Sequence, residues 1–428
     1  MSVALNISES GLQPGVFWSG GLPSDWRVKR LKFVVRPVSA KAAYGESELP
    51  YMGLEHIESW TGRYLEDEDA SPDGVVSHFV PGDVLFGKLR PYLAKVHLAR
   101  HRGVCSTEAL VLRADEELLP EYLRYFLVAP VTIEHINSST YGSKMPRASW
   151  DFIGNQLQPV PPLKQQQKIA AFLDRKTAEI GTLIAKKRRL LDRLAEKRTA
   201  LIARAVTKGL KPDTPMKDSG IEWLGVIPAH WEVCQLKRIW LTSDYGLSES
   251  IRNDHGVPVL RMSCIVNGRI DFDQAGLVED VHEELLLKKD DLLFNRTNSL
   301  DQIAKVGRVD IDLDRPISFA SYLVRIRANE LALPIYLVHL LNSSPFLSFA
   351  RANAIPAIGQ ANLKPSRYGQ IHIPLPGREE QKKIVDAIEE SASATRPLED
   401  RILRSIQALK EQRSALITNA VTGQIKVT

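Results

Sequence analysis

The sequence predicts an α+β protein built from two similar domains, each followed by a long helix. Leu22-Pro23-Ser24-Asp25-Trp26 returns as Ile227-Pro228-Ala229-His230-Trp231 at an offset of 205 residues, and segment 196–207 returns as 411–422 at an offset of 215. Solenoid repeats have periods of roughly 20 to 50 residues, so a period this long indicates a duplicated domain with its connector. Two similar domains in one chain suggest a protein that reads two similar objects.

The composition is that of an ordinary soluble globular protein with room for two or three domains. Of 428 residues, 44% are hydrophobic and 25% are charged. The start of the chain has no signal-peptide pattern, and the apolar stretches are too short and too interrupted to cross a membrane. Cys105, Cys234 and Cys264 show no paired or metal-ligand spacing. We therefore expect a cytoplasmic location and no membrane association.

The positive charge is concentrated in the first long helix. The whole chain carries +5, but residues 164–209 contain thirteen Lys and Arg against four Asp and Glu. The matching stretch from Gly377 to the end of the chain has nine against eight. Two interpretations stay open at this point: a solvated helix face, or a helix that lies near phosphate or an acidic partner.

The chain divides into five segments by composition and repeat position. We predict a first domain at 1–162 with a loose leader over 1–20, a helical region at 163–209, a linker at 210–222, a second domain at 223–376 and a second helical region at 377–428. Short β-branched and aromatic runs mark the expected strands, and Pro120 and Pro334 mark the starts of two helices. The first helix is expected at Pro120–Val128; the expected strands are Lys32–Val35, Val75–Val80, Val84–Phe86, Leu110–Leu112, Val257–Arg261, Leu292–Asn295 and Tyr322–Ile326.

The two helical regions carry the same apolar seam, with spacings that alternate between four and three residues. This spacing is typical of a helix that packs on another helix, so we expect the two to pair antiparallel, with a domain at each end in a pseudo-twofold arrangement. Thr182 and Pro397 occupy matching positions and predict a break in each run; Gly209 and Gly423 occupy the expected C-cap positions. The residues expected to pair the helices and to dock partners are Leu191, Leu194, Leu201, Ile406, Leu409 and Leu416.

The sequence offers no convincing active site. It has neither a phosphate-binding Gly-x-x-x-x-Gly-Lys-Ser/Thr loop nor a Gly-x-Gly-x-x-Gly fingerprint. His56-Ile57-Glu58 lacks the paired cysteines that would complete a zinc deaminase site, and the histidines show no ligand spacing. We therefore expect no catalytic residue, metal or cofactor in this chain. The sequence instead indicates a recognition protein.

Two segments without acidic residues, His135–Trp150 and Arg351–Arg378, occupy matching places in the two domains. Nucleic-acid binding needs cations for phosphate and Arg, Lys, Asn or Gln for base edges. The candidate DNA-binding residues in these segments are Tyr141, Ser143, Lys144, Arg147, Gln360, Asn362, Lys364 and Arg367. A second pair of segments, after the repeated Asp-x-Leu-Phe motif, adds Lys88, Arg90, Arg296 and Asn298. For any one basic residue, a solvated surface charge remains the alternative.

Taken together, these motifs resemble the specificity subunit of type I restriction-modification systems. The matching features are Ile-Pro-x-x-Trp at each domain start, with Leu22 in place of Ile in the first copy, and Asp-x-Leu-Phe within each domain. A proline-rich exit into Gln-x-Lys-Ile completes the set, present as Gln166-Gln167-Lys168-Ile169 and Gln381-Lys382-Lys383-Ile384. Trp26 and Trp231 are expected to be structural anchors. One departure is Gln165, where the second repeat has the family's usual glutamate, Glu380.

The resemblance implies two target recognition domains, each of which reads one half of a bipartite double-stranded DNA sequence with an unread spacer. It also implies that the helices act as a ruler and dock two modification subunits, which would use S-adenosylmethionine to methylate adenine. Restriction subunits that use ATP and magnesium would complete a nuclease for phage defence. Two alternatives stay open: a reader in another methyltransferase-based defence complex, and a coiled-coil interaction scaffold that does not bind DNA.

Overall fold

The computed structural model describes residues 21–43, 49–66, 74–142, 144–248, 255–357 and 359–427. The expected leader, residues 1–20, therefore lies outside the described residues. The chain forms two compact units: unit 1 comprises residues 1–188 and 403–428, and unit 2 comprises residues 189–402. Both long helices contribute residues to both units, so each unit combines one globular domain with the first part of one helix and the last part of the other.

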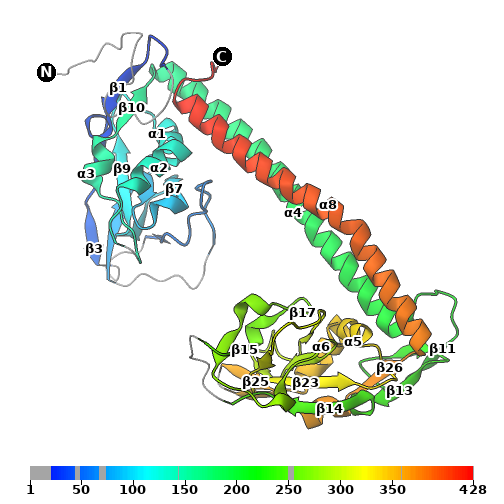
Figure 1. The fold of residues 1–428 in the computed structure, drawn as a ribbon. Helices are drawn as coiled ribbons and strands as arrows, with labels where there is room; N and C mark the ends of the chain where they lie inside the picture. Colours follow the sequence, from blue (N-terminus) through cyan, green and yellow to red (C-terminus); the bar gives the residue numbers. More distant parts are fainter. Residues whose placement is uncertain are drawn as a thin grey trace. The chain divides into compact units, whose positions relative to one another are not determined.

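Unit 1 contains two four-stranded sheets, with strand orders β2-β9-β6-β7 and β3-β5-β8-β4, and the separate pair β1-β10. Its helices, labelled in Figure 1, are α1 (Pro120–Val128), α2 (Pro130–Ser138) and α3 (Trp150–Asn155). Its strands are β1 (Arg27–Arg30), β2 (Val35–Pro37), β3 (Lys41–Ala43), β4 (Tyr51–Met52), β5 (Val75–Phe79), β6 (Val84–Gly87), β7 (Val96–Leu98), β8 (Gly103–Ser106), β9 (Ala109–Ala114) and β10 (Leu157–Val160).

Unit 2 contains a six-stranded sheet, β14-β23-β19-β21-β17-β16, and two three-stranded sheets, β18-β15-β22 and β20-β25-β24. The pairs β13-β26 and β11-β12 complete it; β11 lies in the segment predicted to be a linker. Its helices are α5 (Pro334–Leu341), α6 (Ser344–Ala352) and α7 (Pro365–Gln370). Its strands are β11 (Met216–Asp218), β12 (Val226–Pro228), β13 (Glu232–Gln235), β14 (Trp240–Tyr245), β15 (Val257–Leu260), β16 (Ile265–Val266), β17 (Arg269–Ile270), β18 (Gly276–Val278), β19 (Leu292–Asn295), β20 (Thr297–Asn298), β21 (Val306–Arg308), β22 (Ser318–Phe319), β23 (Leu323–Ala328), β24 (Ile355–Ala357), β25 (Gln360–Asn362) and β26 (His372–Leu375).

The two units repeat one topology, which confirms the predicted α+β class and the internal duplication. The order β2-β9-β6-β7 in unit 1 recurs as β14-β23-β19-β21 in unit 2, and the pair β1-β10 recurs as β13-β26. In each unit the strand of this pair that comes later in the chain leads directly into a long helix. The repeat in the sequence is therefore a repeat of backbone hydrogen bonding.

Most predicted elements fall where the sequence places them, and one does not. Helix α1 has the predicted bounds, and β19 matches the predicted strand. The strand predicted over Lys32–Val35 is wrong: residues Leu31–Phe33 form a 3-10 turn and β2 begins only at Val35. Leu31 is fully buried and donates its N–H to the carbonyl of Gln156, so the chain turns here to bury Leu31 in the core.

The long helices α4 (Leu163–Lys208) and α8 (Arg378–Val421) are each continuous, so the predicted break near Thr182 and Pro397 is wrong. Thr182 lies within α4, and its hydroxyl donates to the carbonyl of Ala178 one turn earlier. A proline inside a helix removes one hydrogen bond and costs about 3 kcal/mol. Packing on either side of Pro397 outweighs that cost. Gly209 and Gly423 have φ of +73° and +72°, which confirms both predicted C-caps.

In each unit, the first turns of one long helix share a hydrophobic core with the last turns of the other. Ile169 and Leu173 of α4 lie in the unit 1 core with Ile417 and Val421 of α8. In unit 2 the roles are exchanged, and the core combines Ala205 and Val206 of α4 with Ile384, Val385 and Ile388 of α8. Within each unit, this is the antiparallel relation that the sequence predicted.

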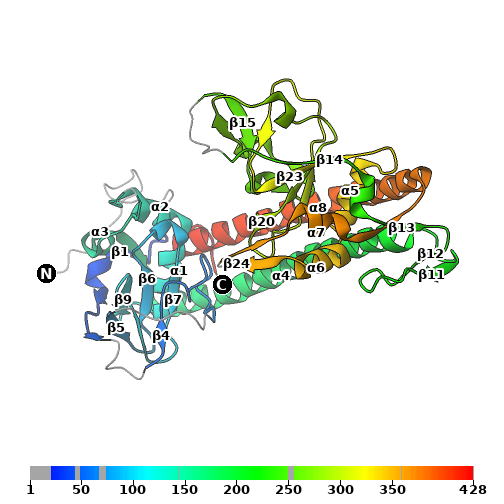
Figure 2. The same cartoon turned by 90° about the horizontal axis from the view of Figure 1, so that it is seen from below.

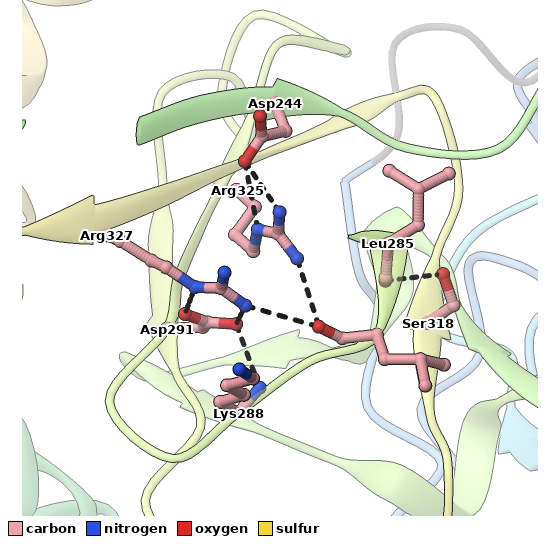
Figure 3. A network of polar contacts seen from close by, with 8 residues as sticks. Asp244, Leu285, Lys288, Asp291, Ser318, Arg325 and Arg327 are labelled. Carbon is pink, nitrogen blue, oxygen red and sulfur yellow. Dashed lines mark hydrogen bonds and ion pairs between the residues drawn. The ribbon is translucent and has the colours of Figure 1, made fainter. Parts of the chain in front are cut away.

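A buried aspartate braces the central sheet of each unit. Asp83 accepts two hydrogen bonds from Arg113, at 2.7 and 2.8 Å, and one from the N–H of Val80 at 2.9 Å. Asp291 repeats this set with Arg327, at 2.7 and 3.1 Å, and with the N–H of Lys288 at 2.8 Å. Figure 3 shows the unit 2 network, in which Arg325 also pairs with Asp244. The repeated Asp-x-Leu-Phe motif is thus a structural brace.

A glutamine and a tyrosine join each domain to both helices. Gln166 and Gln381 are fully buried and accept from the N–H groups of Leu119 and Leu333, each at 2.8 Å. Both side chains also donate to a carbonyl of the proline-rich exit, at 2.8 and 2.9 Å. Tyr122 donates to Val421 in α8, and its counterpart Tyr336 contacts the Val206 carbonyl in α4 at 3.4 Å. These bonds fix the domain to the helix that follows it and to the end of the other.

The two tryptophans that open the repeats are buried, with 6% of Trp26 and 1% of Trp231 exposed. Each lies in the core of its own unit. The prediction that they are structural anchors is confirmed.

Candidate nucleic-acid interface

In unit 1 the two segments predicted to bind DNA lie side by side. Single β-bridges join Leu89 to Arg147 and Tyr141 to Arg147. The N–H of Ala148 donates to the Lys88 carbonyl at 3.0 Å, and the N–H of Arg90 donates to Pro146 at 2.7 Å. Segments about fifty residues apart in sequence therefore form one surface. We call residues 88–90 and 141–147 the unit 1 loop pair.

Unit 2 brings the corresponding segments together in the same way. Strand β20 pairs with β25, with Thr297 opposite Asn362 and Asn298 opposite Ala361, and β24 pairs with β25 on its other side. The N–H of Leu363 donates to the Arg296 carbonyl at 2.8 Å. Figure 2 labels β20 and β24 in this sheet. We call residues 296–298 and 360–367 the unit 2 loop pair.

The backbone hydrogen bonds align the two loop pairs residue by residue. The bond from Ala148 to Lys88 corresponds to the bond from Leu363 to Arg296, and the bond from the Lys88 N–H to Glu108 corresponds to that from the Arg296 N–H to Tyr322. Three matched positions follow: Lys88 with Arg296, Glu108 with Tyr322, and Arg147 with Asn362. This alignment rests on geometry alone, and it fixes a loop register that the sequence repeat left uncertain.

In the unit 1 loop pair, Arg147 is oriented by Glu108. Its Nε and Nη2 donate to the two carboxylate oxygens at 3.0 and 3.3 Å, and this pairing raises the pKa of Arg147. The guanidinium keeps Nη1 for another partner. Tyr141 is 63% exposed, Arg90 and Lys144 are exposed, and Lys88 is half-buried. Ser143 lies outside the described residues.

In the unit 2 loop pair, the amide of Asn362 occupies the position that Arg147 has in unit 1. Asn362 donates one amide hydrogen to the Thr297 hydroxyl at 2.8 Å, which leaves its other hydrogen and its carbonyl oxygen available. Gln360 and Lys364 are exposed, and the side-chain amide oxygen of Asn298 accepts from the backbone N–H of Ser299. Arg367 is exposed and donates to the Asn353 carbonyl at 3.3 Å.

Arg296 has a different environment from the other cations. Its guanidinium lies 5.0 Å from the centre of the Tyr245 ring, and its Nη1 is 3.4 Å from the Ser321 carbonyl. Tyr245 and Tyr322 are 51% and 48% exposed, so an aromatic surface borders this arginine. Cation–π contact and planar stacking are properties that arginine uses at nucleic-acid surfaces.

Sequence reasoning missed Glu108, Tyr245 and Tyr322. None lies in an acid-free segment, and Glu108 would be excluded by a search for positive charge. One signal was available: Glu108 lies two residues before the predicted strand Leu110–Leu112, and Tyr322 opens the predicted strand Tyr322–Ile326. In the structure each lies one residue before its strand, β9 or β23. Their importance comes from strand pairing in three dimensions, which places them beside the loop segments.

Within the described ranges, no helix is both long and apolar enough to cross a membrane. The same ranges contain no group of three or more His, Cys, Asp or Glu side chains that could hold a metal ion.

The repeated domains, the helices and the loop pairs define a two-domain recognition protein, and comparison with known families specifies its class. Residues 81–191 and 228–408 match the family described as the type I restriction modification DNA specificity domain. The chain belongs to this family. The two matched stretches cover both loop-pair segments of each unit, which agrees with the duplication seen in the structure.

Several curated proteins are similar along part or all of the chain. The putative type I restriction enzyme MjaX specificity subunit of Methanocaldococcus jannaschii is 29% identical over 46% of this chain and 48% of its own length. The MjaVIII specificity subunit of the same organism is 24% identical over 95% of this chain and 94% of its own. The EcoKI specificity subunit of Escherichia coli K12 is 25% identical over 74% of this chain and 68% of its own.

A solved chain has a similar fold. It belongs to a study of complex assembly and conformational transition of the type I R-M system, and the comparison gives a TM-score of 0.69 at 18% identity over 95% of this chain and all of that one. At this identity the likeness concerns the fold. The family match over residues 81–191 and 228–408, and not this likeness, identifies the chain as a DNA specificity protein of the type I restriction-modification class.

Proposed function

We propose that each unit reads one half of a bipartite double-stranded DNA target through its loop pair. The observation that carries this proposal is the combination of a shared backbone frame with different side chains at matched positions. Arg147 corresponds to Asn362, Glu108 to Tyr322 and Lys88 to Arg296. A frame that positions variable polar groups in the same way twice is suited to read two different short sequences.

The side chains have the chemistry that base recognition requires. Arginine pairs with the two acceptors of guanine, and asparagine or glutamine pairs with the donor and acceptor of adenine; each good pair contributes about 1 to 3 kcal/mol of discrimination. The exposed cations Arg90, Lys144, Lys364 and Arg367 suit phosphate contacts, which position the protein without reading sequence.

The helices are proposed to dock two modification subunits. Leu183 of α4 and Leu398 of α8 are 46% and 44% exposed and correspond across the repeat at an offset of 215 residues. Two equivalent apolar side chains suit two copies of one partner. Of the six residues predicted for pairing and docking, Leu201 packs on the unit 2 core, and Ile406 is buried with 7% exposed. Leu191, Leu194, Leu409 and Leu416 are half-buried, and the role of all six stays a prediction.

In this proposal the chain is not catalytic by itself. The modification subunits bring S-adenosylmethionine, and restriction subunits bring ATP and magnesium for cleavage. A cytoplasmic location is part of the proposal; it is supported by three free, buried cysteines. Burial raises the pKa of the Cys105 thiol to about 12, so that thiol is unreactive at neutral pH.

The test is the pattern of adenine methylation in cells that carry this gene with its modification partner. We expect a split motif with two specific parts. Exchanging the loop-pair side chains of unit 1 for those of unit 2 should change one part and leave the other intact. A methylation pattern that is the same with and without the gene would overturn the proposal. In the purified complex, DNA affinity should fall steeply with salt, as phosphate contacts require.

A further inference from the structure

The positive charge of α4 is gathered on one side of the helix. At about 100° per residue, nine of its thirteen Lys and Arg fall on an arc about 100° wide. We call these nine residues the α4 basic stripe: Lys164, Lys168, Arg175, Lys186, Arg189, Arg193, Lys197, Arg204 and Lys208. The stripe extends from the first turn of the helix to its last, which a chance distribution of thirteen cations does not favour.

The side chains of the α4 basic stripe are free to meet a partner. All nine residues are exposed, and no ion pair joins any of them to another part of the chain that the structure describes. Only one acidic residue of α4, Glu179, lies on the same arc, and its carboxylate is already paired with Lys176 at 2.8 Å. The stripe is therefore an uncompensated row of positive charge.

Helix α8 provides an internal comparison, because it has the same origin and the same fold. It contains eight Lys and Arg and eight Asp and Glu. The α8 positions that match the stripe include only three cations, Lys383, Arg401 and Arg404, and they include the acidic residues Glu379 and Glu390. Exposure to solvent alone does not explain why two copies of one helix differ in charge. We therefore infer that the positive charge of α4 has a role that α8 does not have.

We propose that the α4 basic stripe contacts the phosphate backbone of the DNA spacer between the two half-sites. This inference rests on the proposed function, since a spacer exists only if the two units read separate half-sites. Helix α4 contributes residues to both units, and DNA read by both must pass from one to the other. Lysine and arginine without a fixed neighbour contact phosphate regardless of base sequence, which suits an unread segment.

A protein partner fits the stripe less well. The centres of protein interfaces are enriched in aromatic residues, methionine and arginine and depleted in lysine, which is the commoner cation of the stripe. The stripe contains five lysines and four arginines, and the small side chains Ala171, Thr182 and Ala200 lie between its cations. Phe172, at the edge of the same arc, is already packed against the unit 1 core. The exposed Leu190 lies only at its edge. The composition therefore favours a polyanion that is contacted through charge.

The test uses the chain assembled with its modification subunits. One variant carries Arg189→Gln, Arg193→Gln and Lys197→Gln, all exposed positions on the stripe. The matched control carries Lys382→Gln, Arg401→Gln and Arg404→Gln, which removes the same charge from exposed positions of α8. Each lost phosphate contact lowers the slope of log affinity against log salt by about 0.9. We expect the stripe variant to lose about two to three units of slope, the control to lose none, and both to keep the sequence preference of the wild type.

A second measurement places the contact on the DNA. Neutral methylphosphonate linkages in the spacer should weaken DNA binding by the wild type and leave binding by the stripe variant unchanged. The same linkages placed outside the half-sites should affect the wild type and the variant equally. Equal salt slopes for variant and wild type would overturn the proposal. So would a stripe variant that fails to assemble with the modification subunits, since that result assigns the stripe to a protein partner. If the wild-type complex shows no sequence preference at all, the proposed function fails instead.

Discussion

Units 1 and 2 share a backbone frame and differ where that frame is exposed. The aspartate brace, the buried glutamine and the tyrosine that contacts both helices recur with nearly the same hydrogen bonds. The loop pairs instead exchange an ion-paired arginine for an asparagine and a glutamate for a tyrosine. The side chains that hold the frame were retained in both copies and these loop side chains were not, which supports the proposal that the loop pairs carry recognition.

The same contrast holds for the long helices. Both are continuous and both end at a glycine with positive φ, but only α4 carries a basic stripe. Duplication therefore preserved what folds each copy, and the two copies diverged in charge on the surfaces available to partners.

The largest effect is expected at the aspartate brace. Asp291→Ala leaves the Arg327 guanidinium and the Lys288 N–H without their carboxylate partner in a site where the aspartate is 2% exposed. Breaking such a pair costs about 3 kcal/mol, because the remaining charge stays largely buried. We expect faster amide hydrogen exchange in β19 and β23, with β6 and β9 unchanged, and the reverse for Asp83→Ala.

The control for this experiment is Asp312→Ala, which removes a carboxylate that is 84% exposed and pairs only with Lys289. Exchange in both units should stay as in the wild type. If either brace variant accelerated amide hydrogen exchange equally in both units, the two units would unfold together. That result would contradict the prediction that each aspartate stabilises only its own unit.

A smaller effect separates the units by pH. Burial, with Arg198 and Arg308 nearby, lowers the pKa of His339 to about 4, whereas Tyr125 occupies the matching position in unit 1. An unfolded histidine titrates near 6.5, so between pH 6.5 and 4 the unfolded chain binds a proton that folded unit 2 does not. Unit 2 should therefore lose stability as the pH falls through this range, by at most roughly 3 kcal/mol.

The measurement is the unfolding free energy of wild type and of His339→Gln between pH 7 and pH 4. As the pH falls, the unfolding free energy of the wild type should decrease relative to that of His339→Gln, and this relative decrease should level off below about pH 4. Unit 1 provides the reference, since its β6 and β9 amides should exchange alike in both proteins. A pH dependence identical in the two proteins would show that His339 is not kept neutral by the fold.

The next effect concerns base recognition. Arg147→Ala should relax reading at one position of the unit 1 half-site, and Gln360→Ala with Asn362→Ala should relax reading of the unit 2 half-site. With about 1 to 3 kcal/mol per contact, the loss is about 5- to 150-fold in discrimination for each contact removed. Since Arg147 suits guanine and Asn362 suits adenine, the affected bases should differ. Affinity for single-base variants of the target measures this.

Two comparisons sharpen that result. Glu108→Gln keeps a hydrogen-bond acceptor for Arg147 but removes the ion pair, so it should weaken discrimination at the same position by less than Arg147→Ala does. Uniform loss across all sequences would instead make the loop pairs phosphate clamps. Disturbance of both half-sites by a change in one unit would contradict the division of labour between the units.

The sequence could predict what depends on local pattern and on the repeat. The bounds of α1, the caps at Gly209 and Gly423, and the two segments of each loop pair follow from proline, glycine and charge placement. It could not predict the continuity of α8 through Pro397, because tertiary packing decides whether a local penalty is outweighed. Nor could it predict that Glu108 orients Arg147, because that contact needs β6 and β9 to be paired.

The smallest effect is expected where the repeat departs from itself at the start of the long helices. Gln165 accepts from the indole N–H of Trp26 at 3.1 Å, whereas the matching Glu380 pairs with His230 at 2.8 Å. His230 is 56% exposed, so its contact with Glu380 is worth under about 1 kcal/mol and His230→Ala should change stability by no more than that. Gln165→Glu keeps an acceptor for Trp26 and should also be nearly neutral. Thermal unfolding of both variants measures this, and a large loss in Gln165→Glu alone would show that unit 1 requires a neutral side chain at this position where unit 2 accepts a carboxylate.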